Sequence, residues 1–290
     1  MNFTTRFAPS PTGPLHLGHA YSAMLAHDLA VSAGGTFLLR IEDIDQSRAR
    51  AKWEAQIYDD LAWLGLKWPL PVLRQSDRLN TYADALDTLW HRGLLYVCTC
   101  TRADIAAAGA APQEGAPLLG PDGVVYPGTC KEQPAAPHLP KPQNAVLRLN
   151  MTKALHDLGD GKNTTITFTE TGDPAHRRDV AYTAETIIRT VGDVVLARRD
   201  MGTSYHLSVV LDDATQHISH VVRGADLFDA TVIHVILQRL LRLSTPIYHH
   251  HTLIRDDAGK RLAKRDDARA ISLFLAEGAT PADIRAMVGL

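Results

Sequence analysis

The stretch that decides the fold reads "NFTTRFAPSPTGPLHLGHAYSAMLAHDLAVSAGGTFLLRIED" and runs from residue 2 to residue 43. Its first residues predict a short strand that breaks at two prolines, positions 9 and 11. Small and apolar residues at helical spacing follow, and the pair Gly34-Gly35 is typical of a helix end. The apolar run 36–43 predicts a second strand that ends in acidic residues. Strand, tight turn, helix and strand form a βαβ unit, which builds parallel sheets with ligand sites at the carboxyl ends of the strands.

The composition of the chain excludes several classes of protein. Of the 290 residues, 45% are hydrophobic and 21% are charged, as in an ordinary globular chain of one large or two modest domains. No apolar run is long enough to span a bilayer, and the first residues lack the features of a secretory signal. Three cysteines do not suggest a disulfide framework, so we expect a cytoplasmic protein. The net charge of −2 argues against general affinity for nucleic acid but leaves room for a local basic face.

The rest of the chain predicts a second half of the sheet behind an insertion. Helices are expected at 46–64 and 78–92, after which residues 106–142 are rich in Ala, Gly and Pro. Strand and helix patterns return from residue 144, and Asp226 is predicted to cap a helix with a strong apolar face. We therefore expect the first half of a Rossmann-type parallel sheet domain at 1–95, an insertion at 96–182, the second half at 183–243, and a basic loop with C-terminal helices at 244–290.

Two histidines, His16 and His19, stand at the predicted start of the first helix. A helix start presents unpaired N–H groups and partial positive charge, which suit phosphate, and Gly18 lets another molecule approach the backbone. A pair of unrelated histidines is one alternative. A metal site is the weaker alternative, because no further ligand lies at a matching spacing nearby. Near the other end, "GKRLAKR" (259–265) is a basic loop that by itself is typical of a solvated turn.

Together, the turn at 16–19 and the loop at 261–265 resemble the HIGH and KMSKS signatures of class I aminoacyl-tRNA synthetases. The segments "RFAPSPTGPLHLGHAYSA", "RIEDIDQSR", "YHLSVVLDD" and "VVRGADL" resemble the glutamyl-tRNA synthetase subgroup, in the same order, so the resemblance covers essentially the whole chain. In that family both signatures hold the phosphates of ATP while a carboxylate attacks the α-phosphorus. The resemblance implies His16, His19 and Lys264 as catalytic residues, and it implies an ATP-binding set of His16, Gly18, His19, Arg261 and Lys264. Arg261 and Ala263 replace a Lys and a Ser of the family, which puts the rate in doubt without implying lost activity.

The same resemblance implies a pocket for glutamate, whose two carboxylates and one ammonium need cations and an anion. Arg6 and Arg223 can each form a bidentate pair with a carboxylate, and which arginine meets which carboxylate stays open. Glu42 can take the ammonium, and Tyr205 can supply a hydroxyl and a wall. The residues implied are Arg6, Ala8, Ser10, Glu42, Tyr205 and Arg223. Taken singly, each arginine would be a surface ion pair, but their placement at predicted strand ends, in family order, favours the pocket.

All three cysteines fall within the insertion. If "LYVCTC" is a strand, Cys98 and Cys100 point to one face, and Cys130 follows Tyr126 by four residues. A structural zinc usually has four ligands and would crosslink an insertion that has little core. The alternative is that the three cysteines are buried thiols that pack as small hydrophobic residues. His138 is the conventional fourth ligand, but the resemblance to short glutamyl-type synthetases implies a tyrosine. We expect one structural Zn²⁺ on Cys98, Cys100, Tyr126 and Cys130.

The chain stops soon after the basic loop, where a full glutamyl-tRNA synthetase continues into an anticodon-binding region. It therefore resembles truncated members of the subgroup, which implies activation of L-glutamate by ATP, with Mg²⁺, and transfer to queuosine in the anticodon of tRNA(Asp). Phosphate contacts of the tRNA are possible at three basic pairs, for which scattered surface charge is an equal explanation: Arg177-Arg178, Arg198-Arg199 and Arg239 with Arg242. A short enzyme that charges tRNA(Glu) and an inactive tRNA-binding paralogue stay open as alternatives. We expect a monomer.

Overall fold

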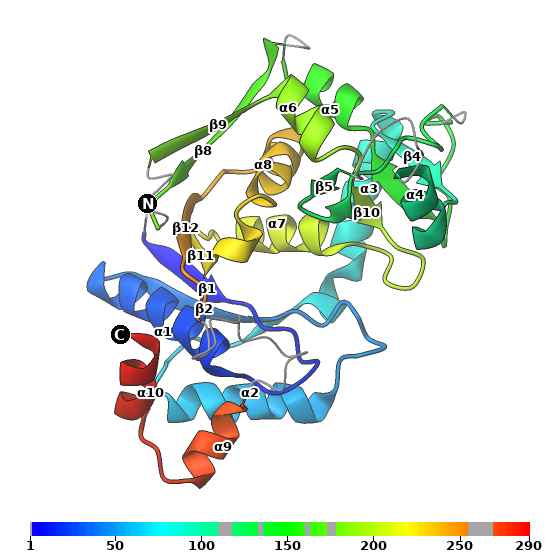
Figure 1. Cartoon of the computed structure of the whole chain (residues 1–290). Helices are drawn as coiled ribbons and strands as arrows, with labels where there is room; N and C mark the ends of the chain where they lie inside the picture. The colour runs from blue at the N-terminus through cyan, green and yellow to red at the C-terminus, as the bar shows by residue number, and fades with distance from the viewer. Residues whose placement is uncertain (1, 110–117, 133–135, 160–162, 173–177, 255–268) are drawn as a thin grey trace.

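The predicted βαβ unit opens the chain. The computed structural model in Figure 1 describes residues 2–109, 118–132, 136–159, 163–172, 178–254 and 269–290. The unit consists of β1 (Thr4–Phe7), α1 (Leu17–Ser32) and β2 (Thr36–Ile41), and β2 also pairs in parallel with β3 (Leu73–Arg74). The turn after α1 requires glycines, because Gly34 has a φ of 64° and a Cβ on Gly35 would lie 1.9 Å from the carbonyl oxygen of Phe3.

A second set of parallel strands continues beside the first. In spatial order these strands are β11 (His220–Gly224), β12 (Ile247–His251), β8 (Thr165–Glu170) and β9 (Arg178–Thr183). The first three are parallel, and β9 is antiparallel to β8. β11 lies next to β1, since the Ser219 N–H donates to the Thr4 carbonyl at 3.1 Å. The predicted α/β class with a parallel sheet is therefore confirmed.

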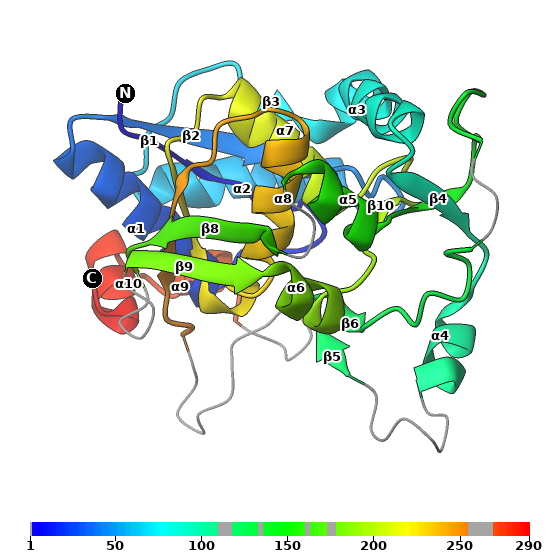
Figure 2. The ribbon, with the colours of Figure 1, turned by 90° about the horizontal axis from the view of Figure 1, so that it is seen from above.

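Helices cover these sheets and connect the strands. They are α2 (Ala51–Trp63), α3 (Leu79–His91), α4 (Arg102–Gly109), α5 (Met151–Asp157), α6 (Ala184–Thr190), α7 (Tyr205–Thr215), α8 (Thr231–Leu240), α9 (Ile271–Ala276) and α10 (Pro281–Val288). α2 begins later than predicted because Asp45 accepts hydrogen bonds from Ser47 and Arg48, which hold the chain before it in a turn. In Figures 1 and 2, α10 lies beside α1, where Arg285 pairs with Asp28 at 2.6 Å.

The predicted cap of α8 is wrong. Asp226 lies in a separate 3-10 turn, Ala225–Leu227, and α8 begins only at Thr231, after Ala230, which makes no side-chain cap. The apolar face of this helix is nevertheless as strong as predicted, and most of its side chains are buried. Seen from above in Figure 2, the β8–β9 hairpin lies beside α8, and Arg239 donates to the carbonyls of Thr165 and Thr167.

The insertion has its own antiparallel sheet. Its strands are β4 (Leu95–Cys98), β7 (Val146–Leu149) and β10 (Val195–Ala197), and a separate hairpin consists of β5 (Leu119–Gly120) and β6 (Gly123–Val124). Two assignments differ from the sequence prediction. β8 and β9, predicted inside the insertion, extend the parallel sheet, where β8 pairs with β12 and β9 pairs with β8. β10, predicted in the second half of the parallel sheet, pairs instead with β7. Alternating polarity identifies a strand but not its partner, which the packing of distant segments selects.

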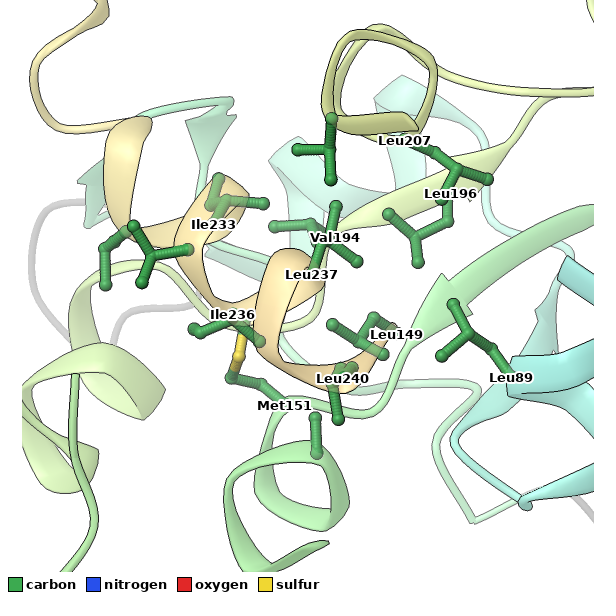
Figure 3. Packing of buried hydrophobic residues seen from close by; sticks show 14 of the residues in the cluster. Leu89, Leu149, Met151, Val194, Leu196, Leu207, Ile233, Ile236, Leu237 and Leu240 are labelled. Atoms are coloured by element: carbon green, nitrogen blue, oxygen red, sulfur yellow. The ribbon is translucent and has the colours of Figure 1, made fainter. Parts of the chain in front are cut away.

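A continuous core joins the insertion to the parallel sheet. Figure 3 shows Ile233, Ile236 and Leu237 of α8 packed towards Leu149 of β7 and Val194 beside β10. These side chains are almost fully buried. A second core lies between α1, β2 and α2 and includes Met24, Leu39 and Leu61. Because the first core includes residues of both sheets, the insertion is packed in a defined position against the parallel sheet.

No helix within the described ranges combines the length and the apolar character needed to cross a bilayer.

Candidate active site

A cavity of about 340 Å³ opens where β1, β2, β11 and β12 end and α1 begins. Eight of the residues implied by the resemblance line it: Arg6, Ala8, His16, Gly18, His19, Glu42, Tyr205 and Arg223. Ser10, also implied, is half-buried close by in the chain but is not among the lining residues. Arg261, Ala263 and Lys264 of the basic loop, and Arg177 of the first basic pair, lie outside the described residues.

The two histidines form the first turn of α1. His16 is the N-cap residue, and its Nδ1 accepts the Gly18 N–H at 3.1 Å. The His16 N–H in turn donates to Nδ1 of His19 at 3.2 Å, and the two ring centroids are 3.8 Å apart. Because both Nδ1 atoms accept, each neutral ring carries its proton on Nε2, which makes Nε2–H the donor. The cluster of possible metal ligands found among the described residues does not include either histidine.

Arg6 is held by a carboxylate that the sequence analysis did not single out. Its Nε and Nη2 donate to the two oxygens of Asp213 at 2.9 and 3.2 Å, and its Nη1 donates to the carbonyl of Val222 at 3.4 Å. Burial raises the pKa of Asp213, but the charges of Arg6 and Arg40 outweigh it and lower that pKa below its usual value. The bidentate geometry expected between Arg6 and a ligand is therefore made with a side chain of α7.

Glu42 is paired with a fully buried arginine of β2. Arg40 Nη2 donates to Glu42 at 3.0 Å, and Arg40 Nη1 donates to Asp213 at 2.6 Å. Burial raises the pKa of Glu42 above its usual value despite this neighbour. A charged residue inside an apolar strand was the signal in the sequence for this pair, since a buried arginine needs carboxylate partners.

Arg223 differs from Arg6 because its described partners are neutral. Its Nε donates to Nε2 of His250 and its Nη1 to Nδ1 of His234, both at 3.0 Å. Its Nη2 donates to the hydroxyl of Thr231 at 2.7 Å and to the carbonyl of Leu227 at 3.2 Å. These four contacts hold a buried cation at the wall of the cavity. Burial lowers the pKa of both His234 and His250, which favours the neutral imidazoles.

Tyr205 is the first residue of α7, so its position follows from the cap of that helix. Ser204 is the N-cap residue, and its hydroxyl accepts the Leu207 N–H at 3.4 Å. Burial raises the pKa of Tyr205, so the phenol keeps its proton at neutral pH. His251, which the sequence analysis missed, also lines the cavity, and its Nε2 lies 2.7 Å from the Ser22 hydroxyl. The run of three histidines at 249–251 was the available signal.

The three cysteines converge at a second place, in the insertion. β4 ends at Cys98, so Cys100 lies beyond the strand, but the sulfurs of Cys98, Cys100 and Cys130 lie within 4.8 Å of one another. A tetrahedral ion with Zn–S bonds of about 2.3 Å separates its sulfurs by about 3.8 Å, so these thiols fit one. Burial raises the pKa of the Cys130 thiol, but hydrogen bonds, the strongest of them from Tyr126, outweigh burial and hold this pKa at about 6. The cluster is suited to a metal ion.

The hydroxyl of Tyr126 lies beside the same sulfurs. It is 3.5 Å from Cys98 Sγ and 3.4 Å from Cys100 Sγ, and it accepts the Cys130 N–H at 2.8 Å. The Arg148 guanidinium stacks on its ring at 3.9 Å. His138 is exposed and does not belong to the cluster of possible ligands. Of the two fourth ligands considered, Tyr126 is the one in contact with the cysteines.

The chain is similar to a family of known enzymes along its whole length. It matches the class I tRNA synthetases (E and Q), catalytic domain, over residues 2–290. It is 64% identical over 290 residues to the glutamyl-Q tRNA(Asp) synthetase of Rhodobacter capsulatus, with 99% of each chain covered. It is 39% identical over 286 residues to that of Deinococcus radiodurans, covering 99% of this chain and 88% of the relative.

Solved structures extend the similarity to the fold. A glutamate tRNA ligase from Elizabethkingia meningosepticum, crystallised in complex with its amino acid, matches with a TM-score of 0.68 and 26% identity. The match covers 92% of this chain and 53% of that ligase, so this chain spans about half the length of the ligase.

Proposed function

This chain belongs to the class I tRNA synthetases (E and Q), and on that premise we propose that it activates L-glutamate with ATP and transfers the glutamyl group to queuosine in tRNA(Asp). One observation carries the proposal. A single cavity joins the charged residues suited to glutamate, Arg6, Glu42 and Arg223, to the helix start that bears His16 and His19. The high identity to a synthetase named for glutamyl-Q tRNA(Asp) supports this acceptor over others.

The first step forms a mixed anhydride. An oxygen of the α-carboxylate attacks the α-phosphorus of ATP, the new O–P bond forms, and the bond from that phosphorus to the bridging oxygen breaks. Pyrophosphate leaves with the bonding electron pair, and glutamyl-adenylate remains. His16 and His19 donate from Nε2 to phosphate oxygens, and the start of α1 adds its positive partial charge, so negative charge is stabilised as it develops. Mg²⁺ bound with the ATP would neutralise part of the phosphate charge.

The second step transfers the acyl group. A hydroxyl oxygen of the queuosine cyclopentenediol attacks the glutamyl carbonyl, the new ester bond forms, and the hydroxyl proton passes to solvent. The bond from the carbonyl carbon to the phosphate oxygen breaks, and AMP leaves. We propose that the basic loop supplies Lys264 and Arg261 to the ATP phosphates, as the family resemblance implies. Binding both substrates in one cavity turns each attack into a reaction between neighbours, which lowers the entropic part of the barrier.

Recognition of glutamate follows from the charges of the cavity. Arg223 has no carboxylate among its described hydrogen-bond partners, so a ligand carboxylate would complete its ion pair. Glu42 would accept the ammonium, and Tyr205 would offer its hydroxyl. Arg6, already paired with Asp213, would keep the field of this region positive for the second carboxylate. Ala8 and Ser10 belong to the proposed set as neighbours of Arg6.

We further propose that Cys98, Cys100, Tyr126 and Cys130 hold one structural zinc ion. When bound, the ion would supply a fixed crosslink between β4 and the loop that bears Cys130. The contact of the Tyr126 hydroxyl with two of the sulfurs supports its choice as the fourth ligand. Metal analysis tests the set: Cys100→Ser and Tyr126→Phe should lower the zinc content, whereas His138→Ala, the matched control, should retain one ion. Unchanged zinc in Cys100→Ser would refute this ligand set.

Radiolabelled substrates test the proposed reaction. The wild-type protein should exchange pyrophosphate into ATP in the presence of glutamate, and it should label queuosine-containing tRNA(Asp) but not tRNA(Asp) that lacks queuosine. Labelling of tRNA(Glu) alone would instead establish the short charging enzyme, and absence of exchange would leave the tRNA-binding paralogue. Glu42→Gln should lose exchange, while Asp179→Asn on the edge strand β9 should keep it. The monomeric state expected from the sequence stays a prediction.

A further inference from the structure

We propose that Asp122, His206 and His234 position the guanidinium of Arg223, and that the insertion thereby sets the affinity of the pocket for glutamate. These three residues form a hydrogen-bonded line from the β5–β6 turn of the insertion, through the first turns of α7 and α8, to the end of β11. The inference rests on the proposed function, because it takes Arg223 as a residue that binds the amino acid.

The direction of every hydrogen bond in this line follows from Arg223. A guanidinium has donors only, so Nδ1 of His234 must accept from Nη1 at 3.0 Å. The neutral His234 ring therefore carries its proton on Nε2, which donates to Nδ1 of His206 at 3.0 Å. His206 then carries its own proton on Nε2, which donates to a carboxylate oxygen of Asp122 at 2.9 Å. Each ring is held in a single tautomer, which the donor at one end of the line and the acceptor at the other both require.

A second and shorter arm holds Arg223 from the other side. Nε of Arg223 donates to Nε2 of His250, whose Nδ1 lies 2.5 Å from a carboxylate oxygen of Glu170. Glu170 is almost fully buried in β8 and also accepts the N–H groups of His250 and Gly172. Both arms place a neutral imidazole against the arginine and end in a carboxylate, with two imidazoles in the first arm and one in the second. The positive charge of Arg223 thus has no carboxylate at contact distance among the described residues, which leaves it available to a ligand.

The number of N–H groups on Arg223 limits how many donors a ligand can use. A guanidinium has five N–H groups, and the bonds to His250, His234, Thr231 and Leu227 use four of them. Among the described residues, one N–H of Nη1 has no partner, and it lies on the same nitrogen that donates to His234. The bond to His234 therefore sets the direction in which that last donor points, while the Nη2 side is fixed by Thr231 and Leu227.

The insertion is positioned precisely enough to provide Asp122. A Cβ on Gly120, at the end of β5, would lie 2.4 Å from the carbonyl oxygen of Thr190, and a Cβ on Gly192 would lie 2.7 Å from a methyl carbon of Val125. The hairpin that bears Asp122 is therefore in close contact with the end of α6. The Asp122 side chain itself is 48% exposed, so its replacement should not disturb the core. Figure 1 shows β5 of this hairpin near the start of α7.

Loss of the Asp122 carboxylate should act on glutamate through this line. Without its acceptor, His206 can place its proton on Nδ1, where it would meet the proton on Nε2 of His234. Two donors would then face each other, and His234 would be free to change its own tautomer and release Arg223. We expect a rise of about 3- to 10-fold in the KM for glutamate, the size of one hydrogen bond, with little change in the KM for ATP.

Steady-state exchange kinetics test this with three variants. Asp122→Ala should raise the glutamate KM as stated and leave kcat within about 2-fold of wild type, a size taken as less than half of one hydrogen bond. Asp122→Asn keeps an oxygen that can accept from His206 and should restore most of the affinity. Asp104→Ala removes another exposed aspartate of the insertion, one that bonds only Thr101 among the contacts described, and serves as the matched control. An unchanged glutamate KM in Asp122→Ala, or equal rises in both alanine variants or for both substrates, would overturn the proposal.

A second measurement reads the line without any reaction. Nitrogen-15 NMR of the free protein should show the Nε2–H tautomer for His206 and His234, and Asp122→Ala should change the signals of both rings. Failure of the proposed function would appear as absent pyrophosphate exchange in the wild-type protein, which leaves this measurement unaffected. Rings with the proton on Nδ1 in the wild-type protein, or His234 signals that ignore the loss of Asp122, would refute the line of hydrogen bonds itself.

Discussion

The pairing of two buried arginines with Asp213 predicts a large loss of stability in Asp213→Asn. Arg6 and Arg40 are about 5% and 0% exposed, and both donate to this carboxylate. Removing one partner of a buried ion pair costs about 3–5 kcal/mol, because the remaining charge stays in a region of low dielectric. With an unfolding entropy of about 2.1 cal/mol/K per residue, 290 residues give about 0.6 kcal/mol/K, so Tm should fall by about 5–8 °C.

Differential scanning calorimetry with urea titration measures this loss. The control is Asp157→Asn, which breaks an ion pair with Arg92 whose two side chains are 38% and 32% exposed and which should cost no more than about 1 kcal/mol. The pKa of Asp213 is lowered in the folded protein, so its contribution is complete above the ordinary aspartate pKa and disappears as the pH falls through the lowered value. A loss in Asp213→Asn no larger than that of the control at neutral pH would refute the argument.

Three further outcomes are expected. Burial lowers the pKa of His220, His234, His250 and His251, so the unfolded chain binds more protons below pH 6.5. The contribution of these histidines to the free energy of unfolding should be fully present above that pH. It should fall between pH 6.5 and 5.5, by at most about 1.4 kcal/mol per pH unit for each histidine. Two carboxyls oppose this, Asp60, whose pKa burial raises to about 6, and Glu42, whose pKa burial also raises. Urea melts that give a flat profile would contradict the prediction. Gly35→Ala should destabilise the protein more than Gly34→Ala in thermal melts, because the added Cβ at position 35 would collide with a backbone oxygen. At position 34 the added Cβ has open space, and the cost is only the strain of the positive φ, roughly 1 kcal/mol. Equal losses in the two variants would speak against the steric argument. Leu237→Ala should cost about 2–5 kcal/mol in the core of Figure 3, and a cost below about 1 kcal/mol would mean that this core is loosely packed.

Much of the fold was accessible to prediction because local chemistry specifies it. Prolines, small and apolar residues at helical spacing, and a pair of glycines mark the strand, helix and strand of residues 2–43, and all three form as expected. The apolar stripe of α8 is equally local. The partner of β10 was not predictable, because a short apolar strand fits either sheet until the neighbouring core is packed.

The same distinction between local sequence patterns and distant packing applies to the residues of the cavity. Residue types and order along the chain indicated Arg6, His16, His19, Glu42, Tyr205 and Arg223, and the structure brings these to one cavity. Asp213 and Arg40 went unrecognised although both lie in segments that carry the resemblance, YHLSVVLDD and RIEDIDQSR, and although a charge inside an apolar strand was visible. Of the histidines that flank Arg223, His250 belongs to the visible run at 249–251, whereas His234 had no signal of its own, since a buried histidine more often simply fills a core.

By itself, the sequence determined the turn with two histidines at the start of α1, the charge types of the cavity that we propose for glutamate, and the triad of cysteines. Each of these depends on residue identity and on spacings of a few positions. Only the tertiary structure decided that a carboxylate neutralises Arg6, whereas Arg223 has no carboxylate partner within the described part of the chain. Arg6 meets Asp213 across 207 residues of chain, and Arg223 is held by imidazoles that connect it to Asp122 in the insertion. Such pairings arise from the packing of distant elements, whose energy no local pattern in the chain records.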